Sequence, residues 1–112
     1  MGIETIGPVT ITVLEGELTA STTITKNAWL ESVFFKCPTL ADAKTATLQI
    51  IDADNYVIYE DTGIGTGATS GEDATSLWRE LYGTVTLKVT ITGTQTGNKA
   101  FEVKMTTRMV SG

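Results

Sequence analysis

Strict alternation of apolar and polar residues between Gly83 and Gly93 constrains this chain more than any other feature of its sequence. A β-strand turns successive side chains to opposite faces, so the pattern predicts a strand with one face in a core and the other in water. The apolar positions are Val85, Leu87, Val89 and Ile91, and threonine or lysine fills the positions between them. Threonine makes up about a fifth of the chain, and its branched β-carbon favours strands throughout the sequence.

A similar alternation follows directly in residues 101–106, where Phe101, Val103 and Met105 are separated by polar residues. The intervening segment contains Gly97, which suits a turn. We therefore expect these two strands to pair as a β-hairpin.

Residues 46–59 predict a second hairpin of the same kind. The alternation in residues 46–50 leads into a short segment, 52–55, that is rich in Asp and Asn. These residue types favour turns because they tolerate positive φ and bond to the nearby backbone. The extended pattern then resumes at residues 56–59.

Three more segments have the composition of strands. Residues 9–13 alternate, a glycine interrupts the pattern as a bulge or a turn, and residues 18–25 resume it. Residues 28–37 carry apolar side chains at both parities, with Trp29 on one face and Phe34 on the other. This predicts a strand that is covered on both faces, with Trp29 inside the core.

The remaining segments are less regular. Residues 63–73 contain four glycines and predict the longest loop, a flexible one. Residues 75–82 are ambiguous, because Leu77 and Leu81 have the i, i+4 spacing of a helix while strands are expected on both sides. We favour an extended segment there.

About seven or eight short strands without a long helical window predict an all-β domain. We expect a β-sandwich or a jelly roll of antiparallel strands with little or no helix. At 112 residues the chain has room for one core. Residues 1–8 are predicted to form an extended N-terminal arm, and residues 9–112 the single sandwich domain.

The composition excludes several kinds of chemistry. The chain has no histidine and a single cysteine, Cys37. These counts exclude an intrachain disulfide, the usual zinc sites and every nucleophile that a histidine activates, so Cys37 is predicted to be a small core residue. A net charge of −5 with scattered basic residues argues against nucleic acid and anionic membranes as partners. We expect a protein that is not an enzyme and needs no cofactor.

Two short motifs resemble ligand-binding loops but fit turns better. The segment 52–55 begins like a calcium loop with alternate carboxylates, yet Val57 stands where that loop requires glycine. Glycines in residues 63–67 resemble a phosphate loop without the Lys-Ser/Thr pair or the helix that such a loop needs. We therefore expect a hairpin turn, a surface loop and no metal site.

Candidate partner contacts lie at two places. Trp78 and Tyr82 would form an aromatic platform for a sugar or a protein if they are exposed, and core packing is the alternative. In the N-terminal arm, Ile3, Ile6 and Pro8 would dock against a partner in an extended form, and a frayed terminus is the alternative. Deleting residues 1–7 is accordingly expected to weaken partner binding.

Four segments carry a resemblance to a known family. They are a Thr-rich start, an AWLESVFF strand ending in CP, an ATLQIIDADNYVIY hairpin, and a Gly-rich loop followed by LYGTVTLKVTITG. Together they resemble the small β-sandwich structural proteins of tailed bacteriophages, especially the decoration or cement proteins of the capsid. The resemblance implies a protein without catalysis that binds the major capsid protein on the outer capsid surface of the virion. It also implies a homo-oligomer, a dimer or a trimer, that is made in the bacterial host cytoplasm.

Two other functions stay open at this point. A tail or baseplate component is the near variant. A carbohydrate-binding or adhesive β-sandwich, using Trp78 and Tyr82, is the rival from another class. Neighbouring capsid and portal genes would favour a virion protein, whereas glycoside hydrolase genes would favour sugar binding.

Overall fold

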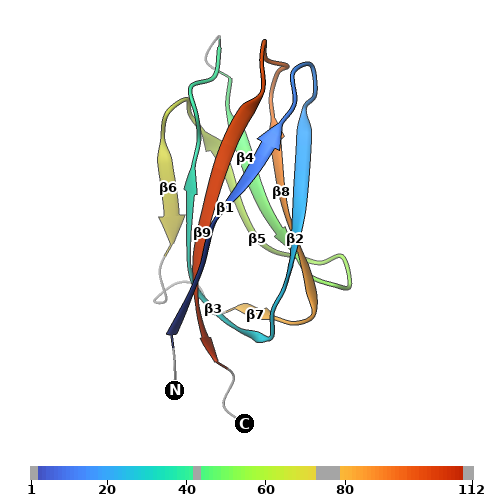
Figure 1. The fold of residues 1–112 in the computed structure, drawn as a ribbon, viewed down its shortest axis with the longest axis vertical. Helices are drawn as coiled ribbons and strands as arrows, with labels where there is room; N and C mark the ends of the chain where they lie inside the picture. The colour runs from blue at the N-terminus through green and yellow to red at the C-terminus, as the bar shows by residue number, and fades with distance from the viewer. Residues whose placement is uncertain (1–2, 42–43, 73–78, 110–112) are drawn as a thin grey trace.

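The chain folds into an antiparallel β-sandwich in a computed structural model, which describes residues 3–41, 44–72 and 79–109 (Figure 1). The described residues form nine strands and no helix. The strands are β1 (Ile3–Val13), β2 (Thr19–Thr25), β3 (Ala28–Lys36), β4 (Ala46–Ile51), β5 (Val57–Ile64), β6 (Thr69–Glu72), β7 (Arg79–Leu81), β8 (Thr84–Ile91) and β9 (Lys99–Met109). The predicted fold class is confirmed, with the short strands β6 and β7 adding to the expected number.

Two sheets make up the sandwich. Sheet A has the order β1-β9-β3-β6, with β7 also pairing with β3, and sheet B has the order β2-β8-β4-β5. The molecule is elongated, with extents of 48 × 24 × 20 Å. Figure 1 shows the long strands running along the long axis, so that each sheet covers the apolar face of the other.

The predicted hairpin between β8 and β9 is wrong, although both strands are present. β8 pairs with β2 and β4 in sheet B, whereas β9 lies between β1 and β3 in sheet A. The connection between them therefore crosses from one sheet to the other. Gln95, only 6% exposed, holds this crossing: its Oε1 accepts from Ala41 N over 2.8 Å, and its Nε2 donates to Gly93 O over 3.2 Å.

The predicted hairpin between β4 and β5 is confirmed. Oδ1 of Asp52 accepts hydrogen bonds from the backbone N–H groups of Asp54 and Tyr56, each over 2.9 Å, and Asn55 has a φ of 69°. The Asp52 carboxylate therefore stabilises the turn itself.

The predicted long loop in residues 63–73 is shorter in the structure. The chain reverses after β5, and β6 returns along β3. Gly67 N donates to Pro38 O over 3.1 Å, which ties this turn to the end of β3. The expectation of an extended segment before Gly83 is confirmed for β7, while residues 73–78 lie outside the described residues.

A β-bulge explains why β3 has apolar residues at both parities. The register with β9 shifts between Leu30 and Ser32, so Leu30 faces the core before the bulge and Val33 and Phe35 face it afterwards. The prediction of a strand covered on both faces is therefore wrong. Trp29 is half-buried on the outer face, not in the core as expected, because its register partner Arg108 faces outward.

The predicted N-terminal arm belongs to the sandwich from Ile3 onwards. Ile3 pairs with Arg108 and Ile6 pairs with Met105, so this segment is the first part of β1 and continues into Val9 after a bulge. The boundary between arm and domain at residue 8 is corrected accordingly. The physical reason is that β9 is long enough to offer ladder partners along the whole of β1.

Both sheets contribute to one core. Phe35 of β3 and Phe101 of β9 are fully buried and stack with ring centroids 5.6 Å apart. The apolar alternation that predicted β8 also holds, because its inward residues are all buried. The buried residues of β8 are Val85, Leu87, Val89 and Ile91.

Candidate partner-binding surfaces

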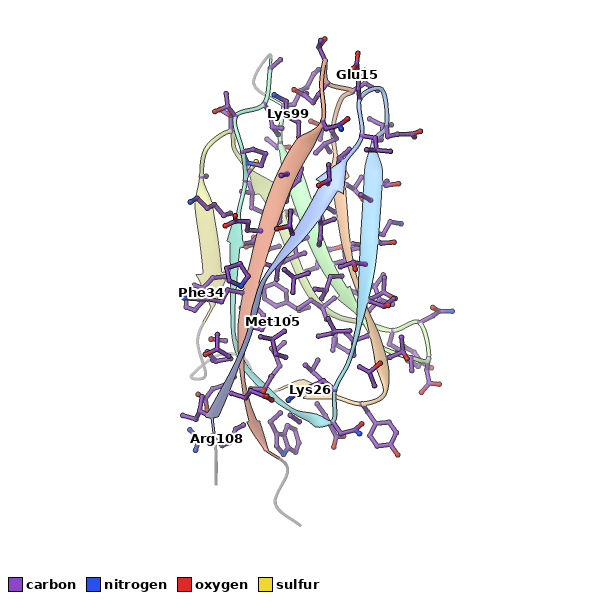
Figure 2. All side chains as sticks on the ribbon, in the orientation of Figure 1. Glu15, Lys26, Phe34, Lys99, Met105 and Arg108 are labelled. Atoms are coloured by element: carbon purple, nitrogen blue, oxygen red, sulfur yellow. The ribbon has the colours of Figure 1, made fainter. Side chains whose placement is uncertain are left out.

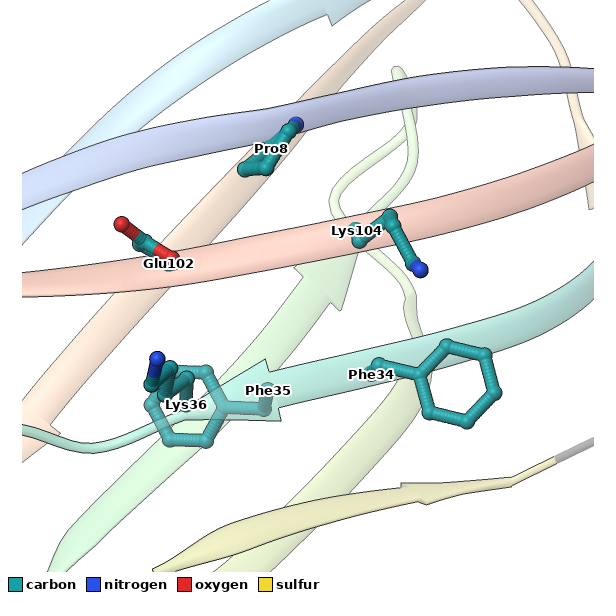
Figure 3. Close-up of a pocket in the computed structure, with 6 residues that line it drawn as sticks. All are labelled: Pro8, Phe34, Phe35, Lys36, Glu102 and Lys104. Atoms are coloured by element: carbon teal, nitrogen blue, oxygen red, sulfur yellow. The ribbon is translucent and has the colours of Figure 1, made fainter. Parts of the chain in front are cut away.

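An open groove lies on the outer face of sheet A (Figure 3). It has a volume of about 230 Å³ and crosses β1, β9 and β3. The residues that line it are Pro8 from β1, Glu102 and Lys104 from β9, and Phe34, Phe35 and Lys36 from β3. We call this feature the sheet A groove.

The sheet A groove has an apolar floor and a charged rim. Phe34 is 40% exposed, and the Lys104 ammonium lies 5.6 Å from the centroid of its ring, within reach of a cation–π interaction. Lys36 stands opposite Glu102 in the ladder, so opposite charges are neighbours beside the apolar floor. An exposed aromatic ring with charges around it suits a protein side chain or a sugar ring as ligand.

The bulge in β3 also positions Phe34. Without the shift between Leu30 and Ser32, Phe34 would share the parity of Leu30 and point into the core. With it, Phe34 faces outward opposite Lys104 of β9. Figure 2 shows the labelled Phe34 at the side of the molecule, between the end that carries Glu15 and Lys99 and the end that carries Lys26 and Arg108.

A second candidate surface lies where the β4–β5 turn approaches Gly83. A Cβ built on Gly83 would lie 3.8 Å from the Cβ of Ala53, so the two turns are in contact at the start of β8. Tyr82 is 71% exposed and Tyr56 is 70% exposed beside these turns. We call this feature the tyrosine end.

Of the predicted contact residues, Pro8 belongs to the sheet A groove and Tyr82 to the tyrosine end. Ile3 is 59% exposed, and Pro8 lines the sheet A groove on the same sheet. Ile6 is half-buried and packs against the core, so it offers little surface to a partner. Tyr82 is exposed but does not line the groove, and Trp78 lies outside the described residues.

Sequence reasoning missed Phe34 and Lys104 as groove residues and Tyr56 as a member of the tyrosine end. The alternation in β9 already places Lys104 outward, but only the pairing of β9 with β3 brings it to Phe34. Tyr56 follows a turn that the sequence predicts correctly. An exposed aromatic residue directly after a hairpin turn is the signal that would have found it.

The described residues offer little catalytic equipment. Cys37 is 2% exposed, and burial raises the pKa of its thiol from 9.0, while a hydrogen bond from the Gly67 backbone acts in the opposite direction. A raised pKa keeps the thiol protonated and unreactive, in agreement with the predicted core role. Within the described part of the chain, no three His, Cys, Asp or Glu residues are grouped so that they could hold a metal ion. The same residues contain no helix with the length and apolar character needed to cross a membrane.

The fold is an antiparallel β-sandwich, and its described residues form a groove on sheet A and exposed tyrosines at the tyrosine end. Similar folds occur in a chain of the cyanophage Pam1 capsid asymmetric unit, with a TM-score of 0.59, 14% identity, and coverage of 96% of this chain and 85% of that chain. They also occur in the carbohydrate-binding module TmCBM61 in complex with β-1,4-galactotriose, with a TM-score of 0.55, 11% identity, and coverage of 95% and 81%. No protein-family model matches the sequence. No curated protein matches it either.

Proposed function

We propose that this chain is a non-enzymatic structural protein of a phage virion that decorates the capsid. In this role it binds the lattice of the major capsid protein on the outer surface of the head and stabilises the shell. The sheet A groove is the observation that carries the proposal, because it combines an exposed aromatic ring with apolar surface on sheet A. The fold that the chain shares with the cyanophage capsid chain supports it.

Decoration requires a protein that binds the assembled shell better than free subunits, because a ligand stabilises only the state that it binds. A small domain with a modest groove suits this task, since many copies act together on one lattice. We propose that the chain acts as a homo-oligomer, a dimer or a trimer, after synthesis in the bacterial host cytoplasm. No cofactor, nucleic acid or membrane is needed for this role.

Co-sedimentation with capsids tests the proposal. The protein is mixed with shells assembled from the major capsid protein of the phage genome that encodes it, and separately with the free subunits. We expect the protein to pellet with the shells and to bind free subunits at least tenfold more weakly. Binding to isolated tails and not to heads would replace decoration by a tail or baseplate role.

Point substitutions in the groove are a better test than deletion of residues 1–7. That deletion removes the partners of Met105 to Arg108 in the ladder, so it would change the fold together with the surface. Phe34→Ser and Lys104→Glu alter the outward face of the same sheet without removing a core residue. We expect each to reduce shell binding at least tenfold, because Phe34 is the exposed aromatic anchor of the groove and Lys104 lies over its ring. Tyr82→Ser is the matched control, and shell binding that is lost in this control but kept in Phe34→Ser would contradict the assignment of the groove.

Carbohydrate binding is the second candidate function, and the tyrosine end favours it. Two tyrosines that are each about 70% exposed beside adjoining turns provide aromatic faces on which sugar rings stack. The fold shared with TmCBM61 supports this candidate as well. Calorimetric titration with β-1,4-galactotriose tests it: binding that is lost in Tyr82→Ala and Tyr56→Ala, but kept in Phe34→Ser, would favour a carbohydrate-binding or adhesive module over decoration.

A further inference from the structure

The margins of the two sheets differ in their protection against pairing with another chain. Edge strands are commonly blunted by proline, charge, bulges or short length. β1 has a bulge at Gly7 and Pro8, and Pro8 has no N–H to donate. β5 is bulged twice against β4 and carries the acidic pair Glu60 and Asp61. At the other margin of sheet A, β6 and β7 have four and three residues.

β2 has none of these protections. Its sequence, TASTTIT, contains no charge and no proline, and its register with β8 is continuous from Thr19 to Thr25. In the described part of the chain, β8 is the only strand that pairs with it. Figure 1 shows β2 at one margin of the sandwich. A regular, uncharged edge strand of β-branched residues is a template for another strand.

The hydrogen bonds at both ends of β2 show which of its backbone groups point away from β8, toward the side of the strand that we call the open margin. Ile91 N donates to Leu18 O over 2.8 Å, and Lys26 N donates to Gly83 O over 3.0 Å. Residues of an antiparallel strand alternate in the side to which their N–H and C=O groups point, so the even-numbered residues of β2 bond to β8. The backbone groups that point away from β8 belong to Thr19, Ser21, Thr23 and Thr25.

We propose that β2 pairs with β2 of a second copy of this chain in antiparallel orientation. The two four-stranded sheets then form one continuous sheet across a dimer. Because the same strand contributes from both copies, the contact is isologous and closes at two subunits. The proposal deepens the homo-oligomer of the proposed function, but it concerns the chain alone and does not depend on the nature of the groove's partner.

One register uses all of the available backbone groups. With Thr22 on the two-fold axis, Ser21 pairs with Thr23 of the partner subunit, and Thr19 pairs with Thr25 of the partner subunit. Pairs of hydroxyl side chains are favourable neighbours on a sheet face. No two like charges face each other within this contact, because β2 has no charged residue.

In the same register, apolar side chains of one copy cover apolar side chains of the other. This self-complementarity favours a second copy of the chain as the partner of β2. Ala20 and Ile24 pack against the core but are half-buried at the margin. Pairing places Ala20 beside Ile24 of the partner subunit, so both lose contact with water. Leu18, which is 45% exposed, falls opposite Lys26 of the partner subunit, whose methylene groups can cover it.

Sedimentation velocity of the full chain, over a range of concentrations, tests the pairing. We expect a species with twice the 11.9 kDa mass of one chain. Thr23→Pro removes an N–H that points to the open margin and is expected to raise the dimer dissociation constant at least tenfold. Thr86→Lys is the matched control, because it changes the outer face of the central strand β8 and is expected to leave the dimer intact.

A charge pair tests the register. In Ser21→Glu with Thr23→Glu, each glutamate faces a glutamate of the partner subunit, and the dimer is expected to dissociate. In Ser21→Glu with Thr23→Lys, opposite charges face each other, and the dimer is expected to persist and to weaken with salt. Circular dichroism of each variant establishes that the monomer is folded.

Three outcomes would overturn the proposal. They are a wild-type monomer at the highest soluble concentration, a trimer, or a dimer that folded Thr23→Pro leaves unchanged. Capsid co-sedimentation is read separately through Phe34→Ser, so the failure of β2 pairing leaves the test of decoration intact. Shell binding without dimerisation would retain the proposed function and reject this inference.

Discussion

β1 and β2 are consecutive edge strands that differ in how their margins are protected. β1 belongs to sheet A, is interrupted by a bulge between Ile6 and Val9, and contains Pro8. β2 belongs to sheet B and runs without interruption against β8. Both are rich in residues that favour strands, so their difference lies in a few backbone features.

The difference indicates that the ability of an edge strand to pair with another chain depends on the local features of that strand. It does not follow from the sandwich fold as a whole. At Gly7, a φ of +97° and close approach to β9 give β1 its irregular middle. β2 is regular, and the backbone N–H and C=O groups of every second residue point away from β8. Four tests of this contrast follow, from the largest expected effect to the smallest.

Thr22→Pro and Thr23→Pro test which residues of β2 bond to β8. Thr22 is predicted to donate to Leu87 in the ladder, so proline there should lower the free energy of unfolding by about 3 kcal/mol. Proline at Thr23 removes an outward N–H and should cost less than about 1 kcal/mol. Urea denaturation at low protein concentration measures both, since dilution removes any contribution from dimerisation. Equal losses of free energy in the two variants would contradict the assignment of Thr22 to the hydrogen bonds with β8 and of Thr23 to the open margin.

Gly7→Ala tests what holds the bulge of β1. A Cβ at Gly7 would lie 2.6 Å from Val9 N and 2.7 Å from Val103 O, and neither backbone atom can move without disturbing the β1–β9 ladder. We expect a loss of about 2–3 kcal/mol in the free energy of unfolding. Gly16→Ala is the control, because φ is +81° there but no atom lies within 4 Å. Its expected cost is about 1 kcal/mol, and a cost equal to that of Gly7→Ala would show that strain at positive φ explains both.

Gln95→Ala tests the end of the sandwich where β1 passes into β2. Gly16 N of this turn donates to Gln95 O over 3.2 Å, and the Gln95 side chain bonds to Ala41 and Gly93. Alanine removes both side-chain bonds from a buried site, so we expect a loss of about 1–2 kcal/mol by thermal or urea unfolding. Gln49→Ala, which removes a more exposed bond to Glu60, should cost less than half as much.

Glu4→Gln tests the ion pair that joins β1 to the end of β2. Glu4 bonds to Lys26, and their side chains are 57% and 24% exposed. Exposed pairs contribute little, so we expect a loss below about 1 kcal/mol that disappears in high salt. A loss that persists in high salt would indicate a packing role for the Glu4 side chain.

Much of the fold could be predicted from alternation alone. The pattern in residues 84–91 places the correct residues inside, and the Asp52 turn was identified by residue type. Phe34 could not be placed, because its direction depends on a bulge whose register is set by β9. The groove therefore could not be assembled from the sequence, although each of its strands was expected.

The sequence by itself determined that the chain is an all-β sandwich without histidine chemistry, because period-two alternation and residue counts are local properties. Only the tertiary structure decided that β8 and β9 lie in different sheets and that β1 extends to Ile3. It also decided that β2 lies at a margin. The physical reason is that strand partners are chosen by long-range hydrogen bonds and by buried groups such as Gln95, which connect residues far apart in the chain.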